Sequence, residues 1–345
     1  MDIQVILTNQ TPVFSAAPGS AAVDINGNLV NEGFPLIRAR TLSVVADEGD
    51  GVLKARRLPV VPGNSMRNLL RRIMLKHSIE PSLKDRVQVS IGAYAGMYAG
   101  NASGNPDGVA ATFDEIVAVR NHPFLGLFGG GPRMMQGRLM VDTLYPIHTH
   151  AQRIIGEGFE DRMIGDRIVD LVWTRRVDPV TKLNDTEDTG IIKDGVKAAN
   201  DWIRALAEGS AAKADKKKAK KAEATEAGDG DTEKAARGLN GFNAHEVVIP
   251  GVSWVWRINA DNPTEAQIGL ILAALSKLPL ERLAGGGNKD YGRVVVDDIR
   301  LNGNSVWGGG QLNEQSVTAY MDALAEAMDN LDAEGFENFI TSQKG

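Results

Sequence analysis

Closely spaced cations are the side chains of this sequence that offer the clearest chemistry. Residues 52–76 carry seven basic residues and no acidic one, namely Lys54, Arg56, Arg57, Arg67, Arg71, Arg72 and Lys76. Within this window a short apolar run ends in a Pro-Gly turn. Asn64 or Ser65 can then cap a helix that we expect to start near Met66. A helix N-terminus followed by several cations suits the phosphates of a polynucleotide better than one small anion. The alternative is a solvated basic face on an ordinary surface helix.

The predicted helix positions these cations on one side. At about 100° per residue, apolar and basic positions separate onto opposite faces. The apolar face holds Leu69, Leu70, Ile73 and Met74. The opposite face holds Arg67, Arg71, Arg72 and Lys76, which we therefore expect to form a single stripe of cations.

Composition indicates a soluble globular protein. The 345 residues are 43% hydrophobic and 24% charged, enough for one large domain or two. The absence of cysteine excludes disulfides, thiolate zinc sites and cysteine nucleophiles, and it fits a reducing compartment. No apolar stretch has the length of a membrane span, and the first residues lack the charged region of a signal peptide. We therefore expect a cytoplasmic protein without a membrane partner.

Charge is unevenly distributed along the chain. The net charge is −6, yet residues 1–76 carry nine Lys or Arg against six Asp or Glu. Residues 308–345 carry one Lys against seven acidic residues, and an acidic amphipathic helix is predicted at 313–331. This asymmetry permits a basic groove on an acidic protein and favours head-to-tail contact between copies.

Two glycine-rich segments are further candidates for binding. Phe128 is followed by Gly129, Gly130 and Gly131, and then by Arg133, so the backbone there can approach a ligand closely or form a loose surface turn. The second segment, 285–293, is not a Walker loop. It ends in Arg-Val rather than Lys-Ser or Lys-Thr, and it leads from a helix into a strand.

Candidate catalytic groups are few. His148 and His150 could bind a metal, because a strand would place both imidazoles on one face. No third ligand stands at motif spacing, so we expect a structural or surface role and no metal. Asp24, Asp47 and Asp50 could assist metal-dependent phosphodiester cleavage, whereas solvated turn aspartates are the simpler interpretation. The low-complexity stretch 209–238 has almost no large apolar residue, which predicts a disordered insertion.

Three segments in order resemble the RAMP superfamily of CRISPR effector proteins. These are P-G-N-S-M-R-N-L-L-R near the N-terminus, F-L-G-L-F-G-G-G in the middle, and A-G-G-G-N-K-D-Y-G-R-V-V-V after a leucine-rich helix. The residues that match the family pattern are Pro62, Gly63, Ser65, Met66, Arg67, Leu70, Arg71, Leu127, Phe128, Gly129, Gly285, Gly286, Gly287, Tyr291, Gly292 and Arg293. The chain looks most like the type IV version of the guide-RNA backbone subunit.

The resemblance implies one α+β domain over residues 1–345. In that family the fold is a modified ferredoxin-like or RNA-recognition-motif palm with an inserted thumb hairpin and finger-like insertions. By resemblance, residues 160–250 would form the thumb and contain the insertion 209–238, and residues 87–120 would form a finger. Residues 313–345 would form the acidic C-terminal helix. Candidate wedges between bases are Met163, Ile164 and Val177.

The resemblance also implies a non-catalytic RNA-binding role without a cofactor. The chain would polymerise along guide RNA with other effector subunits and hold its phosphates, leaving the bases free to pair with target DNA or RNA. The implied RNA-binding residues are Arg38, Arg40, Asn64, Ser65, Arg67, Arg71, Arg72, Phe128, Gly129, Gly130, Arg133, Arg175, Arg176, Gly286, Gly287, Lys289 and Arg293. The alternative is a metal-dependent RNase of the same fold, and a third interpretation is a small-molecule enzyme with a phosphate pocket at the glycine loop.

Overall fold

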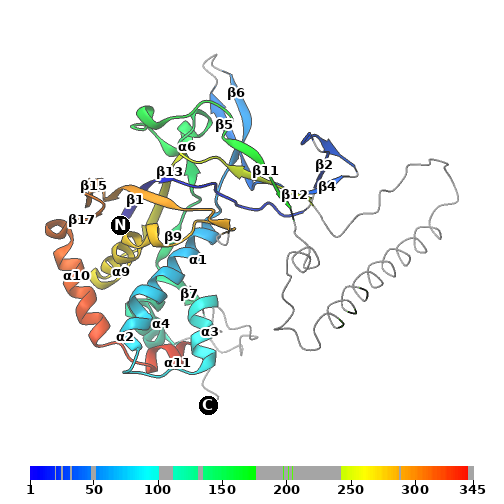
Figure 1. Cartoon of the computed structure of the whole chain (residues 1–345). Helices are drawn as coiled ribbons and strands as arrows, with labels where there is room; N and C mark the ends of the chain where they lie inside the picture. The colour runs from blue at the N-terminus through cyan, green and yellow to red at the C-terminus, as the bar shows by residue number, and fades with distance from the viewer. Residues whose placement is uncertain are drawn as a thin grey trace. The chain divides into compact units, whose positions relative to one another are not determined.

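The chain forms two compact units (Figure 1). The first comprises Met1–Gly19, Ile37–Leu171 and Glu246–Gly345, and the second comprises Ser20–Leu36 and Val172–His245. The structure is a computed structural model that describes residues 1–19, 21–24, 26–31, 33–47, 52–100, 112–130, 135–175, 197, 201, 204, 242–286 and 289–340. The predicted insertion 209–238 lies outside these residues.

An antiparallel sheet organises the first unit. Strand β1 (Asp2–Asn9) lies between the antiparallel strands β13 (Ser253–Ala260) and β14 (Val294–Leu301). Strands β9 (Leu139–Val141) and β10 (Tyr145–Pro146) pair with the other edge of β13, and β15 (Asn304–Ser305) extends β14. Along the chain, α1 (Gly63–Met74) is the first helix after β1, and α9 (Glu265–Ser276) lies between β13 and β14. The central elements therefore follow the order β–α–β–β–α–β.

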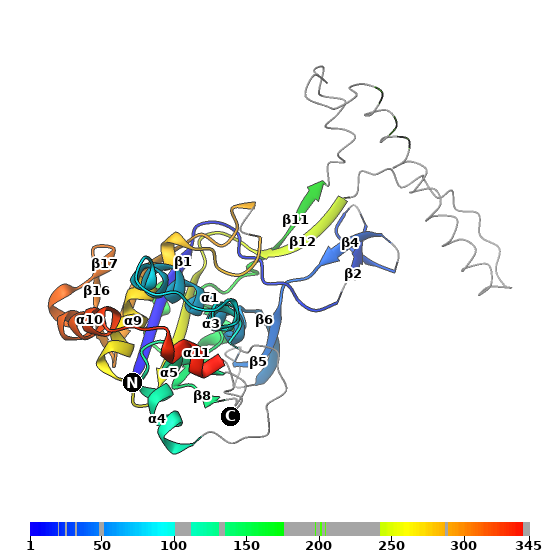
Figure 2. The same ribbon diagram turned by 90° about the horizontal axis from the view of Figure 1, so that it is seen from below.

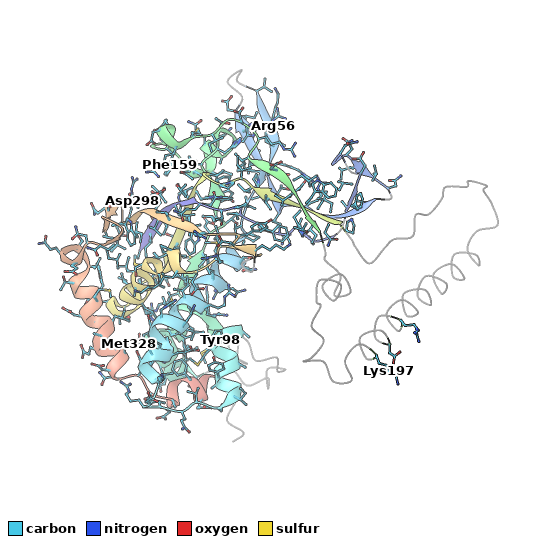
Figure 3. All side chains as sticks on the ribbon, viewed as in Figure 1. Arg56, Tyr98, Phe159, Lys197, Asp298 and Met328 are labelled. Carbon is cyan, nitrogen blue, oxygen red and sulfur yellow. The ribbon has the colours of Figure 1, made fainter. Side chains whose placement is uncertain are left out.

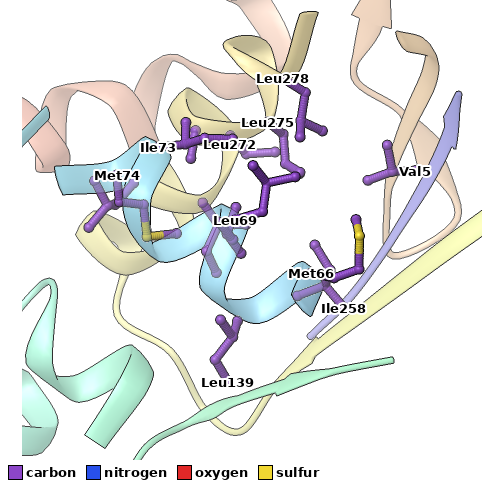
Figure 4. Packing of buried hydrophobic residues seen from close by; sticks show 14 of the residues in the cluster. Val5, Met66, Leu69, Ile73, Met74, Leu139, Ile258, Leu272, Leu275 and Leu278 are labelled. Atoms are coloured by element: carbon purple, nitrogen blue, oxygen red, sulfur yellow. The ribbon is translucent and has the colours of Figure 1, made fainter. Parts of the chain in front are cut away.

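Helices cover one face of this sheet. Alternate residues of β1, namely Ile3, Val5 and Leu7, are completely buried in the same cluster as the apolar faces of α1 and α9. Figure 4 shows α1 residues packed against α9 residues and against Val5 and Ile258 of the sheet. The four apolar positions predicted on α1 are at most 4% exposed, so this prediction is confirmed. Helix α10 (Glu314–Asp329) packs on α9 through the inward face predicted for the C-terminal helix.

A hairpin and a short helical segment cover part of the opposite face. Ile6 and Val255 point to this side, where they join Val44 of β5 (Thr41–Asp47) and Leu58 of β6 (Leu53–Pro59). The same cluster includes Ile147, Ala151, Ile155 and Phe159, the last of which is labelled in Figure 3. The sheet around Ile6 is therefore filled by the chain's own apolar side chains and is not an open platform for a ligand.

A second sheet holds most of the described strands of the second unit. Its order is β11 (Val169–Arg175), β12 (Phe242–Val248), β4 (Phe34–Ile37), β2 (Ala21–Val23) and β3 (Leu29–Val30). Phe34 contacts Trp173 edge-on with ring centroids 5.5 Å apart. The glycine- and proline-rich stretch from residue 9 to residue 35, which reads as one long loop, thus contains three short strands. Their shortness hides the two-residue alternation that marks a strand.

Local sequence signals were misleading at two helix starts. The alternating segment 87–92 predicts a strand, but Ser90 caps α3 (Ile91–Ala99) by accepting the N–H of Ala93. Asn262, which is followed by proline, predicts a helix start, but α9 begins after Thr264, whose hydroxyl and the Gln267 side chain form a capping box. Residues from Phe113 onward form helix α4 (Phe113–Asn121).

The remaining elements are short. They are α2 (Glu80–Leu83), α5 (Leu125–Phe128), α6 (Gln152–Ile155), α11 (Glu334–Ile340), the π-helical turn η1 (Leu75–Ile79), the 3-10 turns η2 (Thr149–Ala151), η3 (Glu160–Arg162) and η4 (Leu278–Leu280), and the strands β7 (Gly129–Gly130), β8 (Met135–Gln136), β16 (Trp307–Gly308) and β17 (Gln311–Leu312). Among the described residues, no helix combines the length and the apolar character that crossing a membrane requires. Figure 2 shows α11 beside α3 in the first unit, a contact that the hydrogen bonds between Ser90 and Glu337 support.

Candidate nucleic-acid interface

The basic helix α1 begins earlier than its sequence suggests. Pro62 is the N-cap, and its carbonyl oxygen accepts the N–H groups of Ser65 and Met66 at 2.9 and 3.1 Å. The prediction that Asn64 or Ser65 caps the helix near Met66 is therefore wrong, because the Pro-Gly turn runs directly into the first helical turn. Within the described ranges no side chain caps this N-terminus. No acidic residue lies in its first turn, and Asn64 and Ser65 are exposed. The helix start thus offers its dipole and its free N–H groups to an anion.

The cations of α1 do not form the single stripe that was predicted. Lys76 lies 2.6 Å from the Glu281 carboxylate, which His77 also contacts at 3.1 Å. Arg72 is exposed and has no ion pair in the part of the chain that the structure describes. Arg67 and Arg71, four residues apart, point instead toward Phe128. The prediction failed because adjacent positions 71 and 72 differ by about 100° around the helix and meet different neighbours.

Arg71 is buried, although its position predicts a solvated cation. The residue is only 6% exposed, and its guanidinium carbon lies 4.7 Å from the centre of the Phe128 ring. Gly100 also packs against the guanidinium group, since a Cβ built on Gly100 would fall less than 3.0 Å from three guanidinium atoms. Gly100 caps α3 in the left-handed conformation with φ of 75°. Phe128 and Gly100 are remote from Arg71 in the sequence, so helical periodicity carries no information about this burial.

Arg67 lies beside Arg71 against the same aromatic ring. Its guanidinium carbon is 5.9 Å from the Phe128 ring centre, and one terminal nitrogen donates to the Phe128 carbonyl oxygen. The Nε atoms of both arginines are buried without an acceptor, and no carboxylate among the described residues pairs with either guanidinium. Burial lowers the pKa of Arg67. Burial, followed by repulsion from Arg67, lowers the pKa of Arg71 to about 10, so Arg71 stays charged at neutral pH.

A tightly packed segment positions Phe128. Its ring lies 5.2 Å from that of Phe124, which in turn lies 6.4 Å from Phe336 of α11. His122 holds the start of α5, because its Nδ1 accepts the N–H groups of Phe124 and Leu125 at 3.2 and 3.1 Å. Burial lowers the pKa of His122 to about 4, so the neutral ring accepts these bonds at physiological pH.

The glycines after Phe128 are required by close packing. Gly129 and Gly130 have φ of 58° and 105°, and they pair with β8. A Cβ on Gly130 would lie less than 3.0 Å from the carbonyl oxygen of Gly100. The interpretation of this segment as a loose surface turn is therefore wrong for these two glycines. Gly131 and Arg133 lie outside the described residues.

Backbone hydrogen bonds connect the start of α1 to the second glycine-rich segment. The N–H of Val60 donates to the Arg40 carbonyl oxygen at 3.0 Å, and the N–H of Arg40 donates to the Ser15 carbonyl oxygen. Phe14, next to Ser15, accepts the N–H of Gly285 at 2.9 Å. These bonds link the residues just before α1, through Arg40, to the glycine loop. Arg40 is half-buried and Arg38 is exposed. Arg38 also lies 3.7 Å from the Glu246 carboxylate.

The glycine loop itself is partly neutralised. Asp290 contacts Arg293, which the resemblance assigns to RNA binding, and it also accepts from Arg282 at 3.0 Å. Gly286 has φ of 78°, and the N–H of Lys289 donates to its carbonyl oxygen at 2.8 Å. Three predicted contacts, Gly287, Arg176 and the side chain of Arg175, lie outside what the structure describes.

Sequence reasoning missed Gly100, which shapes the arginine pocket. The signal was present, because A-Y-A-G-M-Y-A followed by glycine reads as a helix that ends in a left-handed cap. The alternation of residues 87–90 obscured it.

Two of the candidate groups, His148 and Asp24, are held by hydrogen bonds within the chain. His148 is buried, its Nε2 lies 3.0 Å from the Asp166 carbonyl oxygen, and its Nδ1 accepts the N–H of His150. Both ring nitrogens are therefore committed to the chain. Asp24 closes a turn by accepting from Asn26 and Asn28, and these bonds lower its pKa. No three His, Asp or Glu side chains are grouped for a metal in the described ranges, which do not include Asp50.

Comparison with known proteins identifies the architecture. No protein-family model matches the sequence, and no curated protein matches it. A chain of a solved structure titled "Type IV-B CRISPR Complex" is similar over 87% of this chain and 91% of that chain, with a TM-score of 0.50 at 14% sequence identity. The fold is that of a CRISPR-complex subunit. The predicted resemblance to a type IV CRISPR protein is thereby confirmed as a likeness of fold.

Proposed function

We propose that the chain is a non-catalytic backbone subunit of a type IV CRISPR ribonucleoprotein. Copies of it would assemble along the guide RNA with other effector subunits and hold the phosphates, so that the bases pair with target nucleic acid. The observation that carries this proposal is the pair of guanidinium groups of Arg67 and Arg71. They are buried against Phe128, and no carboxylate among the described residues pairs with them.

Phosphate is the ligand that this pair fits best. A buried guanidinium without an anionic partner is costly, and chains normally pair it with a carboxylate or with a bound anion. Two guanidinium groups side by side present several N–H donors to the oxygens of a phosphodiester group. The exposed Arg72 and the uncapped start of α1 lie on the same helix and supply further sites for neighbouring phosphates. A chain of phosphates therefore matches the site better than one small anion.

We assign the parts of the fold by the same resemblance. The order β–α–β–β–α–β suits a ferredoxin-like palm. In RNA-recognition motifs the sheet binds bases on the face away from the helices, but here Ile6, Val255 and their neighbours fill that region. RNA would thus run along the helical side, past α1 and the glycine loop. Residues 160–250 would form the thumb and residues 87–120 a finger.

The observations favour this role over the metal-dependent RNase. An RNase of this kind needs carboxylates that are free to hold a cation near the scissile phosphate. Of the three candidates, Asp24 is held in a turn by Asn26 and Asn28, and Asp47 stands at the end of β5. Neither has the grouped acidic neighbours that a cation site requires within the described residues.

Purification from the native expression context tests the proposed function. We expect the chain to elute as a large multimer with an absorbance ratio typical of nucleoprotein, and with RNase-sensitive RNA of uniform length. A monomer free of nucleic acid, even at low salt, would mean that the cations of α1 form only a solvated surface.

Substituting Gly100 tests whether the arginine pocket is the binding site. In Gly100→Ala the new methyl group would displace the Arg71 guanidinium, so we expect RNA affinity to fall about tenfold, the equivalent of one lost charge-assisted contact. Gly158→Ala is the matched control, because Gly158 also has a positive φ of 87° but nothing lies within 4 Å of its Cβ position. Both variants lose about 1 kcal/mol of stability from backbone strain.

The two variants should therefore differ in RNA affinity much more than in melting temperature. Equal RNA affinities of Gly100→Ala and Gly158→Ala, measured by fluorescence anisotropy on the same RNA, would contradict a role for the Arg71 pocket.

A further inference from the structure

Two carboxylates pair with basic side chains in and beside the glycine loop. Glu281 contacts Lys76 and His77, and Asp290 contacts Arg282 and Arg293. These pairs contrast with Arg67 and Arg71, which have no carboxylate partner in the described part of the chain. Glu281 directly precedes Arg282 in the sequence. Its contact with Lys76 therefore places the end of the basic helical segment beside the start of the loop.

Asp290 has an unusual position between its two arginines. Its Oδ1 accepts from Arg282 at 3.0 Å, and its Oδ2 accepts from Arg293. The arginines stand at opposite ends of the loop, and the aspartate reaches both from a left-handed backbone conformation with φ of 58°. The side chains of Arg282, Asp290 and Arg293 are 35%, 48% and 45% exposed, so water and other anions have access to all three.

The loop does not depend on this carboxylate to stay closed. Leu283 donates to Gly292 at 2.8 Å, Gly292 donates to Pro12 at 2.8 Å, and Gly285 donates to Phe14 at 2.9 Å. These backbone bonds hold both ends of the loop against the strand segment after β1. Exposed ion pairs contribute little stability, so the Asp290 carboxylate is exchangeable at small cost.

We propose that Asp290 is a displaceable substitute for a phosphate group. In the free chain it occupies Arg282 and Arg293, and on binding it releases them to a phosphodiester group of a polynucleotide. A carboxylate between two guanidinium groups makes the contacts that phosphate oxygens would make there. The tethered aspartate excludes free inorganic phosphate, whereas a polynucleotide already held at Arg67 and Arg71 brings its next phosphates at high local concentration. This inference rests on the proposed function and adds a selection for long polyanions over small ones.

Asp290→Asn isolates the proposed exchange. Asparagine tolerates the left-handed backbone and keeps the side-chain shape without the charge. We expect this variant to bind a single-stranded RNA about three- to tenfold tighter, with a salt slope steeper by about 0.7 for each phosphate gained. Asp298→Asn is the matched control, because Asp298 also pairs with an arginine, Arg300 of β14, at 2.7 Å (Figure 3). The RNA affinity of this control variant should stay unchanged.

A triple variant assigns the gain to the released arginines. Asp290→Asn combined with Arg282→Ala and Arg293→Ala should bind no tighter than the Arg282→Ala, Arg293→Ala variant, because the carboxylate then has no arginine to release. Asp290→Gly, which also removes the charge and accepts a positive φ without strain, repeats the test if the asparagine variant folds poorly.

The outcomes separate the exchange from the proposed function. A wild-type chain that binds no RNA overturns the proposed function and the exchange together. A wild-type chain that binds RNA, with Asp290→Asn and Asp290→Gly binding equally or more weakly, overturns the exchange alone. Tighter binding caused by Asp290→Asn that persists when both Arg282 and Arg293 are alanine also overturns it.

Discussion

Arg71→Met should raise the melting temperature of the RNA-free chain, although it removes a side chain from a helix face assigned to binding. Arg71 is 6% exposed, its Nε has no acceptor among the residues that the structure describes, and Arg67 repels it. Methionine fills a similar volume and needs no partner. Replacing buried charge by an apolar side chain stabilises proteins by about 1–4 kcal/mol, and loss of the contact with Phe128 offsets part of this gain. We expect a net gain of about 1–2 kcal/mol, or roughly 3–6 °C.

Arg72→Met provides the comparison for this effect. Arg72 is the next residue of the same helix and is exposed, so its replacement should change the melting temperature by less than about 1 °C. Calorimetry of both variants without RNA measures the difference. A lower melting temperature for Arg71→Met than for wild type would mean that the guanidinium is satisfied within the free chain. The Arg71 side chain would then need no bound phosphate.

The stability of the chain should fall between pH 6.5 and pH 4 because of His122. Its pKa is lowered from 6.5 to about 4 in the folded chain by burial, and its Nδ1 must stay unprotonated to accept from Phe124 and Leu125. Below pH 6.5 the unfolded chain takes up a proton that the folded chain refuses. The contribution of His122 is thus complete above pH 6.5 and is lost as the pH falls toward 4, by about 2–3 kcal/mol.

His122→Asn separates this titration from that of the carboxylates. Asparagine can accept the same N–H groups, since it is a good helix cap, but it does not titrate. The stability difference between wild type and His122→Asn, measured by urea unfolding, should therefore shift by about 2–3 kcal/mol in favour of the variant between pH 7 and pH 4.5. A difference that does not depend on pH would show that His122 is protonated equally in both states.

Periodicity predicted the parts of the fold that local patterns determine. The apolar positions of α1 and of α10 are regularly spaced, and they are buried as expected. The same reasoning failed at residues 87–92, where alternation outweighed the capping Ser90. It also failed in the stretch that holds β2, β3 and β4, because strands this short leave no periodic signal.

The candidate site was predicted in composition but not in arrangement. The sequence identified Arg67, Arg71 and Phe128, yet it placed Arg71 in solvent. Its burial depends on Gly100 and on the aromatic contacts of Phe128, which only the folded chain brings together. The neutralisation of Arg293 by Asp290 was equally invisible, since a residue three positions away becomes a partner only through the shape of the loop.

The most direct test of the account is the RNA affinity of wild type and of Arg71→Met for two single-stranded RNAs of equal length and unrelated sequence. We predict that the variant binds both RNAs at least about tenfold more weakly and by the same factor, because phosphates are common to both. Arg300→Met, whose arginine is paired with Asp298, should bind like wild type. Unchanged affinity of Arg71→Met, or a loss confined to one of the two sequences, would contradict a phosphate-binding site at Arg67 and Arg71.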